Sequence, residues 1–163
     1  MKFLKRNIII VDGPTGAGKS SLCWHLINDF KFNYYHIKRW HKELQNYYKD
    51  IIFRIIDDVS STDSNYVIER FHLSDYVFSY INKTPMFTID IYNFLQNYCL
   101  KNNIKLTTIL CLPDKFKNEK DDEIIINEFK KIKTSKFFKF YHFNYNIDSN
   151  YYNLDTNINK INE

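Results

Sequence analysis

The stretch VDGPTGAGKSSL, residues 11–22, contains every glycine of the 163-residue chain. The run that leads into it, NIIIV at residues 7–11, is short, apolar and β-branched, which is the pattern of a central parallel strand buried on both faces. In the segment that follows, residues 19–30, apolar residues recur at helical spacing. The sequence therefore predicts a tight turn between a buried strand and a helix.

This turn matches the pattern G-x-x-x-x-G-K-[ST] over residues 13–20, GPTGAGKS. Glycine lets the backbone curl so that successive N–H groups point at phosphate oxygens, and the start of the next helix adds to the positive field. In this pattern Lys19 reaches the β- and γ-phosphates, and the Ser20 hydroxyl binds Mg²⁺. A glycine-rich turn that binds nothing is the alternative. We predict that ATP is bound by Gly13, Pro14, Thr15, Gly16, Ala17, Gly18, Lys19, Ser20 and Ser21.

Strands and helices alternate along the rest of the chain. Besides 7–11, the pattern predicts strands at 34–37, 66–70, 105–112 and 136–144. Besides 19–30, it predicts helices at 39–59, 84–102 and 121–132, a turn at 60–65 and a weaker helical pattern at 150–161. Alternation of this kind favours a parallel sheet with helices on both faces and right-handed crossovers. We expect an α/β three-layer sandwich with a five-stranded parallel sheet.

Length and composition predict one domain over residues 1–163. The net charge of +4 suits anionic ligands, but acidic and basic residues are mixed throughout, so nucleic acid is not favoured as a partner. The cysteines are far apart and form no C-x-x-C pair, which predicts neither disulfides nor a zinc site. No apolar run approaches the roughly 18 residues that span a bilayer, and the first residues show no cleavage-site pattern. We expect a cytoplasmic protein, in the host cytoplasm if the gene is viral, without membrane association.

The segment VIERFHLSDYVF, residues 67–78, lies at the end of the third predicted strand. Ligands of open parallel sheets lie beyond the carboxyl ends of the strands, so Glu69 and Arg70 should face the same cleft as the glycine-rich loop. Glu69 would hold Mg²⁺, directly or through water, and Arg70 would bind the acceptor or neutralise charge on the transferred group. An ordinary ion pair between them is the structural alternative.

The order of these segments resembles thymidylate kinase-like P-loop enzymes, especially small phage deoxynucleoside monophosphate kinases. The resemblance covers residues 7 to about 148 and includes HIKRW (36–40), ERFHLSDYVF (69–78) and CLPDKFKNEKDDE (111–123). It implies the nucleoside monophosphate kinase version of the P-loop fold and Mg²⁺-dependent transfer from ATP to a deoxynucleoside monophosphate. Lys19, Glu69 and Arg70 would be the catalytic residues.

The resemblance also implies a short lid around residues 113–123. Lids of this family usually carry arginines, whereas this segment offers Lys115, Lys117 and Lys120, which supply charge without a planar bidentate fork. Two further departures are Thr15, where the family usually has Asp, and Glu69-Arg70, where it usually has Asp-Arg. Relatives are often dimers, so a homodimer is possible.

The acceptor class rests on the end of the second predicted strand. Deoxynucleoside kinases place a carboxylate there to deprotonate a 5′-hydroxyl, and HIKRW contains no acid. A monophosphate acceptor needs a cationic clamp instead, which Arg39 would supply together with Arg70. Acceptor contacts are expected from Arg39, Trp40, Arg70, Phe71 and His72. A deoxynucleoside kinase, a DNA-directed kinase acting on a modified base or 5′ end, and a catalytically weak nucleotide-binding protein remain alternatives.

Overall fold

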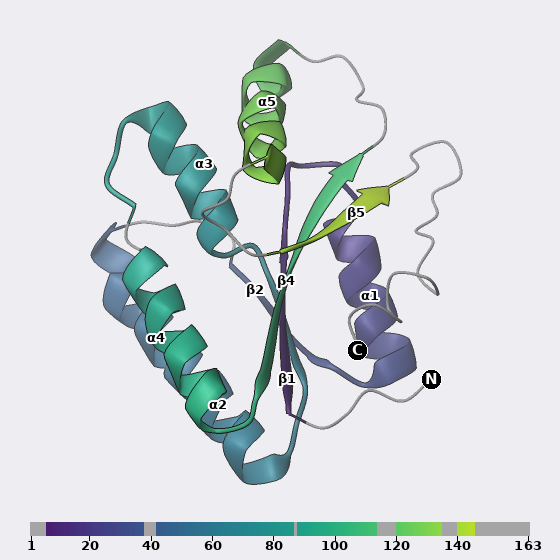
Figure 1. The fold of residues 1–163 in the computed structure, drawn as a ribbon, viewed down its shortest axis with the longest axis vertical. Helices are drawn as coiled ribbons and strands as arrows, with labels where there is room; N and C mark the ends of the chain where they lie inside the picture. Colours follow the sequence, from purple (N-terminus) through teal and green to yellow (C-terminus); the bar gives the residue numbers. More distant parts are fainter. Residues whose placement is uncertain (1–5, 38–41, 87, 114–119, 135–139, 146–163) are drawn as a thin grey trace.

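The computed structural model describes residues 6–37, 42–86, 88–113, 120–134 and 140–145, and its centre is a parallel sheet (Figure 1). The strands described are β1 Asn7–Asp12, β2 Asn33–His36, β3 Tyr66–Glu69, β4 Lys105–Pro113 and β5 Tyr141–Tyr145. Their order across the sheet is β2-β3-β1-β4-β5, and each neighbouring pair is parallel. The predicted parallel α/β fold is therefore confirmed.

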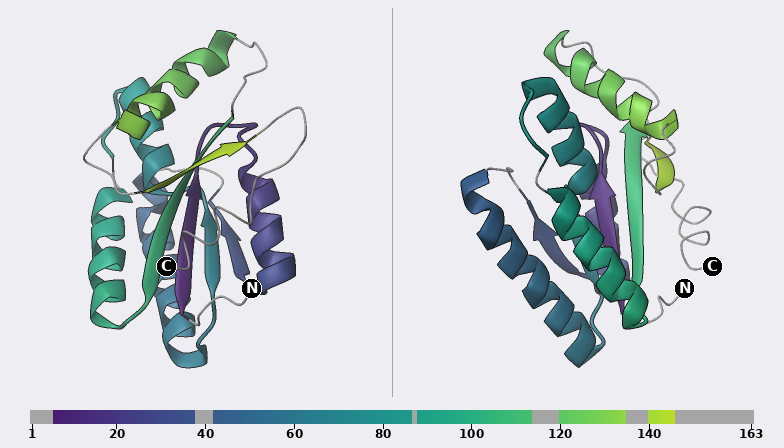
Figure 2. Two further views of the ribbon diagram at one scale, coloured as in Figure 1. Left: turned by 45° about the vertical axis from the view of Figure 1, so that its right-hand side comes forward. Right: turned by 60° about the vertical axis from the view of Figure 1, so that its left-hand side comes forward.

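Helices cover both faces of this sheet (Figure 2). Their bounds are α1 Lys19–Phe30, α2 Gln45–Thr62, α3 His72–Asn82, α4 Thr88–Lys101 and α5 Lys120–Thr134, with a 3-10 helix, η1 Lys42–Leu44, before α2. α1 lies on one face, and α2 and α4 lie together on the other. α3 and α5 pack on each other and on β4, on the same face as α2 and α4. The result is the three-layer arrangement that the sequence predicts.

The apolar run of β1 explains why this strand lies at the centre. Ile9 and Val11 pack into the core beneath α1, whereas Ile8 and Ile10 pack into the core beneath α2 and α4. Each buried side chain of this size contributes roughly 1.5–3 kcal/mol relative to an exposed one. A strand whose side chains are buried on both faces of the sheet belongs in the interior of the sheet, with a neighbouring strand on each side. β1 has this position, because it lies between β3 and β4.

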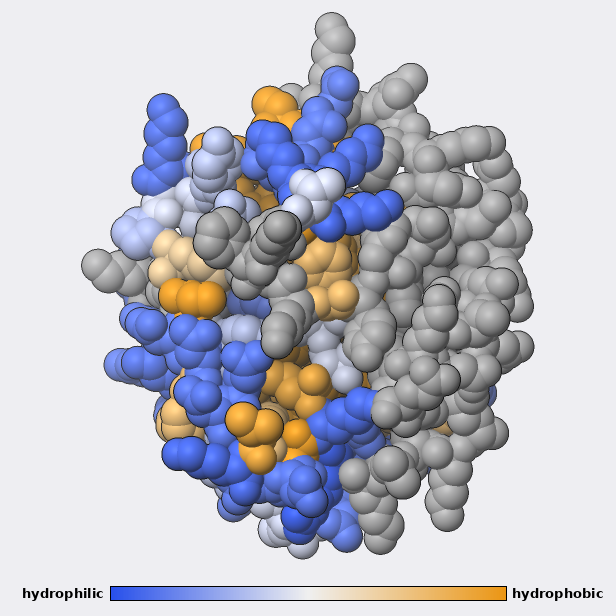
Figure 3. Space-filling view, in the orientation of Figure 1, coloured by the Kyte–Doolittle hydropathy of each residue, from blue (hydrophilic) through white to orange (hydrophobic). Residues whose placement is uncertain are grey.

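Among the residues coloured in Figure 3, hydrophilic ones predominate, and the apolar ones occur in small groups between them. Scattered apolar residues of this kind are ordinary on protein surfaces.

Sequence reasoning missed helix α3. This helix has no side-chain N-cap of its own, because Phe71 occupies the cap position. The carboxylate of Asp12 instead accepts hydrogen bonds from the backbone N–H groups of Leu73 and Ser74. A cap supplied from 61 positions away leaves no local pattern to recognise.

The predicted start of the next helix at Thr84 and Pro85 is wrong, since α4 begins at Thr88. The N–H group of Thr84 bonds the carbonyl oxygen of Ser79, so this segment completes the end of α3. The N–H and hydroxyl groups of Thr88 donate to Asp75 at 3.0 and 2.7 Å. Again the capping carboxylate comes from another element.

Helix α2 begins and ends later than predicted. Residues 60–62, which the turn pattern covers, are helical, and the hydroxyl of Thr62 bonds back to the carbonyl oxygen of Asp58. The helix ends at Thr62, and its C-cap residue, Asp63, adopts a left-handed conformation. Within this helix, Tyr47 is 55% exposed, whereas Tyr48 is buried.

Strand β5 begins later than the predicted range 136–144, of which residues 136–139 lie outside the described part of the chain. The segment 150–161 lies outside it as well.

Candidate functional site

The glycine-rich loop leaves the carboxyl end of β1 and returns as helix α1. Gly13 has a φ of +147°, and a Cβ atom there would lie 2.2 Å from the carbonyl oxygen of Cys111 on β4. Gly18 adopts a left-handed conformation and caps the N-terminus of α1. Both positions need a residue without a side chain, one for space and one for backbone conformation. The loop is therefore held against the neighbouring strand in a tightly curled form.

Lys19 begins α1 and folds back over the loop. Its Nζ donates a hydrogen bond of 2.6 Å to the carbonyl oxygen of Pro14, and the residue is 4% exposed. Burial, with a smaller contribution from the positive charge of Arg70, lowers the pKa of Lys19 to about 8. An ammonium group that is short of solvent gains strongly from an anionic ligand. A bound polyphosphate would supply the negative charge that stabilises this buried ammonium group.

Ser20 and Glu69 meet beside the loop. The Ser20 hydroxyl donates to Oε1 of Glu69 at 2.9 Å, and the phenol of Tyr34 donates to Oε2 at 2.6 Å. Burial, with the hydrogen bond to Glu69, raises the pKa of Tyr34. A hydroxyl and a carboxylate are the hard oxygen donors that Mg²⁺ prefers, so this pair fits the predicted metal site. Tyr34 was not predicted, and nothing in its sequence context singles it out.

Among the described residues, no group of three or more His, Cys, Asp or Glu side chains is placed to hold a metal by itself. A magnesium ion at Ser20 and Glu69 would therefore depend on phosphate oxygens and water for its remaining ligands.

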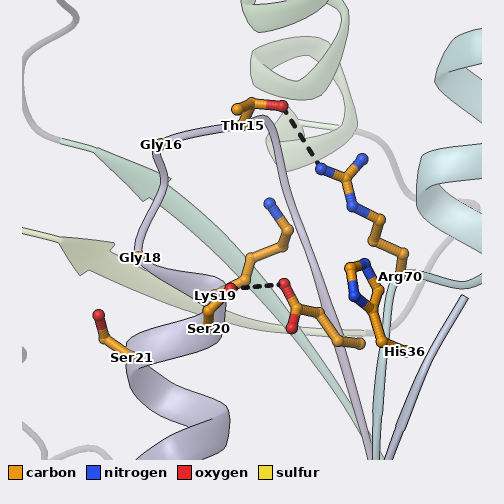
Figure 4. A pocket seen from close by; sticks show the side chains of 9 residues that line it. Thr15, Gly16, Gly18, Lys19, Ser20, Ser21, His36 and Arg70 are labelled. Carbon is orange, nitrogen blue, oxygen red and sulfur yellow. Dashed lines mark hydrogen bonds between the residues drawn. The ribbon is translucent and has the colours of Figure 1, made fainter. Parts of the chain in front are cut away.

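Arg70 follows β3 directly and reaches over the loop. Its backbone N–H bonds the carbonyl oxygen of Val11 at 2.9 Å, and its φ is +68°, in the left-handed region. Its guanidinium lies 3.4 Å from the hydroxyl of Thr15 (Figure 4). Arg70 and Glu69 therefore reach the same site, as predicted, but Glu69 bonds Ser20 and Tyr34.

These side chains surround a cavity of about 340 Å³ at the carboxyl end of the sheet (Figure 4). It is lined by Thr15, Gly16, Gly18, Lys19, Ser20, Ser21, His36, Glu69 and Arg70. All but one of these residues belong to the predicted ATP-binding and catalytic set. The exception is His36 at the end of β2, which was not among the predicted site residues.

Two predicted acceptor-binding residues do not reach this cavity. Phe71 is fully buried in the core beneath α2 and α4. His72 is also fully buried and stacks on Tyr92, with 3.7 Å between the ring centroids. Burial lowers the pKa of His72 to about 3. Both side chains lie in the packed interior at the start of helix α3. Their position therefore does not support the prediction that they contact an acceptor.

The remaining predicted site residues are not placed by the structure. Four of them lie outside the described residues: Arg39, Trp40, Lys115 and Lys117. Lys120 is the first residue of α5, but its side chain is not described. Their roles as acceptor clamp and lid stay predictions.

Asp12 is the structural residue that sequence reasoning overlooked. It is fully buried, and its carboxylate accepts bonds from the N–H groups of Phe71, Leu73 and Ser74 and from the hydroxyl of Ser74. Burial raises the pKa of Asp12, although these hydrogen bonds oppose the shift. The available signal was an acidic residue at the end of an otherwise apolar buried strand. Such a residue needs partners from another part of the chain.

None of the described helices combines the length and the apolar character that a membrane crossing requires.

Comparison with known proteins gives a likeness in fold. No protein-family model matches the chain, and no curated protein sequence matches it significantly. The crystal structure of YorR from Bacillus subtilis in complex with phosphorylated GDP is similar, with a TM-score of 0.58 and 15% identity over 86% of each chain. Deoxyadenosine kinase from M. mycoides with bound dATP is similar with a TM-score of 0.51 and 15% identity, over 96% of this chain and 100% of that one. The chain therefore has the α/β fold of P-loop kinases.

Proposed function

We propose that this chain is a Mg²⁺-dependent kinase that transfers the γ-phosphoryl group of ATP to a deoxynucleoside monophosphate. The observation that carries the proposal is the cavity in which the loop, Lys19, the Ser20–Glu69 pair and Arg70 meet. Two anionic reactants and a transferred group with spread negative charge need this combination of donors and cations. The fold shared with deoxyadenosine kinase supports a nucleoside or nucleotide acceptor.

The donor side of the reaction is assigned to the loop and Lys19. Backbone N–H groups of the curled loop would hold the phosphates, and Lys19 would exchange its bond to the Pro14 carbonyl for a γ-phosphate oxygen. Ser20 and Glu69 would hold Mg²⁺, which would supply positive charge to neutralise the phosphates. The positioning of reactants, rather than covalent chemistry, would provide most of the rate enhancement.

The acceptor side is assigned to Arg70. Its guanidinium reaches over the loop, near Thr15, where it can form two parallel hydrogen bonds with a phosphate. A monophosphate is already anionic at neutral pH, so it needs this cationic clamp and no base. A guanidinium in the cavity that can bind a phosphate through two hydrogen bonds favours a monophosphate as the first candidate.

A deoxynucleoside is the second candidate, and His36 favours it. A 5′-hydroxyl must lose a proton as it attacks, and an imidazole in the cavity is a suitable acceptor for it. The other lining groups are less suited, because Glu69 already accepts bonds on both oxygens and Arg70 does not deprotonate. The likeness to deoxyadenosine kinase points the same way.

A screen of acceptors with ATP and Mg²⁺ tests the proposal. ADP release is followed with each deoxynucleoside monophosphate, each deoxynucleoside and a set of DNA oligonucleotides. Turnover with a monophosphate supports the first candidate. Turnover with a deoxynucleoside that His36→Asn abolishes supports the second. Turnover with oligonucleotides alone assigns a DNA-directed kinase, and nucleotide binding without turnover assigns a nucleotide-binding protein and ends the kinase proposal.

A further inference from the structure

Arg70 is held between two consecutive residues of β1. The peptide group before its Cα donates its N–H to the carbonyl oxygen of Val11 at 2.9 Å. The peptide group after its Cα, which carries the N–H of Phe71, donates to the carboxylate of Asp12, also at 2.9 Å. The backbone dihedrals of Arg70 describe the angle between these two peptide groups. Val11 and Asp12 therefore set the backbone conformation of Arg70 from outside.

That conformation is an unfavourable one for a residue with a side chain. Arg70 has a φ of +68°, where Cβ is crowded and glycine is the usual residue. Such strain persists only where surrounding contacts impose it. Asp12 is fully buried and binds the turn through three N–H groups and one hydroxyl, which makes it the strongest of these contacts.

The strained backbone determines where the guanidinium lies. A residue in the left-handed region projects its Cβ in a different direction from the same residue in a strand or a right-handed helix. From this turn the side chain of Arg70 extends over the cavity toward Thr15 (Figure 4). A relaxed turn with negative φ would aim the side chain elsewhere.

We infer that Asp12 is a positioning residue that imposes the left-handed turn on Arg70 and thereby aims its guanidinium at the phosphate of the acceptor. The catalytic half of this statement rests on the proposed function, whereas the conformational half does not. Because Asp12 also precedes Gly13 directly, one residue ties the start of the glycine-rich loop to the cation that reaches over it.

Thermal unfolding of Arg70→Gly and Arg70→Ala tests the conformational half. Both variants remove the guanidinium, but only alanine keeps the penalty of positive φ. In the otherwise unchanged protein, we expect the Gly variant to unfold at a Tm roughly 2–4 °C above that of the Ala variant. In an Asp12→Asn background, which weakens the hold on the turn, we expect less than half of this difference. Equal differences in the two backgrounds would overturn the inference.

Steady-state kinetics test the catalytic half. Asp12→Asn should lower kcat/KM for the acceptor about 10-fold in the Arg70 protein and leave it nearly unchanged in the Arg70→Ala protein, since there is no guanidinium left to aim. Asp75→Asn is the matched control. Asp75 is also a buried carboxylate that caps a helix, α4, and its carboxylate accepts bonds from Ser79 and Thr88. Its effect should be the same with and without Arg70.

The two measurements separate the possible failures. If the protein transfers no phosphoryl group to any acceptor, the proposed function fails, and the Tm comparison still decides whether Asp12 controls Arg70. If transfer occurs and Asp12→Asn lowers kcat/KM equally in both backgrounds, the proposed function stands and the positioning role of Asp12 is wrong.

Discussion

The hydroxyl of Ser20 lies 2.9 Å from Oε1 of Glu69, although 49 positions separate the two residues. The bond joins the first turn of α1 to the end of β3, and Tyr34 fixes the second oxygen of the same carboxylate. A hydroxyl and a carboxylate are thus already side by side where the predicted metal site requires them. Their separate contributions can be measured.

Glu69→Gln removes the charge of this carboxylate and keeps its shape. We expect the Mg²⁺ concentration for half-maximal binding of ATP, measured by calorimetry, to rise about 10-fold or more, because an amide oxygen is a weaker ligand for a hard cation. Tyr34→Phe is the control, since it leaves both the carboxylate and the Ser20 bond in place, and a much smaller rise is expected. An unchanged Mg²⁺ requirement in Glu69→Gln would remove Glu69 from the metal site.

Lys19→Met should lower activity and raise stability. Loss of the ammonium should reduce kcat/KM by about 10²-fold or more. Because burial lowers the pKa of Lys19 from 10.5 to about 8, the charged form costs folding free energy below pH 8. Above pH 10.5, lysine is neutral in both states and this cost is absent.

We therefore expect the free energy of unfolding of the Met variant to exceed that of the original protein by roughly 1–3 kcal/mol at pH 7, with the gain shrinking between pH 8 and 10.5. Urea denaturation at several pH values measures it. A variant that is less stable at pH 7 would contradict this account of the Lys19 environment.

Gly13→Ala should be strongly destabilising. The new Cβ would lie 2.2 Å from the carbonyl oxygen of Cys111, so β4 or the loop must move. We expect a loss of about 3 kcal/mol or more in the free energy of unfolding, measured by urea denaturation. Gly16→Ala is the control, because a Cβ atom added there would have no atom within 4 Å to clash with, and only the positive φ opposes the change. A loss of about 1 kcal/mol is expected there, and equal losses at both sites would contradict the steric argument.

His72 should make the protein sensitive to acid. Its pKa is about 3 in the folded protein and 6.5 when unfolded, so the unfolded state alone takes up the proton as the pH falls below 6.5. The stability from the buried neutral ring is complete above pH 6.5 and decreases by about 1.4 kcal/mol per pH unit toward pH 3.

His72→Phe keeps a ring that can stack on Tyr92 and cannot be protonated. Between pH 7 and pH 4, we expect its free energy of unfolding to fall by about 3 kcal/mol less than that of the original protein. The comparison cancels the titration of all other groups. Parallel pH profiles would show that His72 is protonated in the folded state.

Secondary-structure elements whose sequence patterns lie within a short stretch of the chain were predictable. The β-branched run at residues 7–11 and the glycine pattern at 13–20 indicate β1, the loop and α1, because their causes lie within a few residues of each other. Helix α3 and the start of α4 were not predictable in this way. Their caps, Asp12 and Asp75, come from other elements, so the deciding hydrogen bonds cross long stretches of chain.

The same distinction applies to the candidate site. The loop residues, Glu69 and Arg70 could be named because strand ends of a parallel sheet converge on one edge. The directions in which individual side chains point could not be predicted from the sequence. Phe71 and His72 were expected in the cavity and are buried, while His36 and Tyr34 reach the site from β2, because only the packing of helix α3 and the register of β2 against β3 decide these directions.

By itself, the sequence determined a parallel α/β fold and a tight glycine-rich loop between β1 and α1, because the hydrophobic period and the glycine positions are local properties of the chain. The tertiary structure alone decided that Glu69 bonds Ser20 and Tyr34, and that Asp12 holds the turn of Arg70. Those contacts join residues 35 to 59 positions apart. Such contacts exist only when strands of defined order and register bring the two segments together.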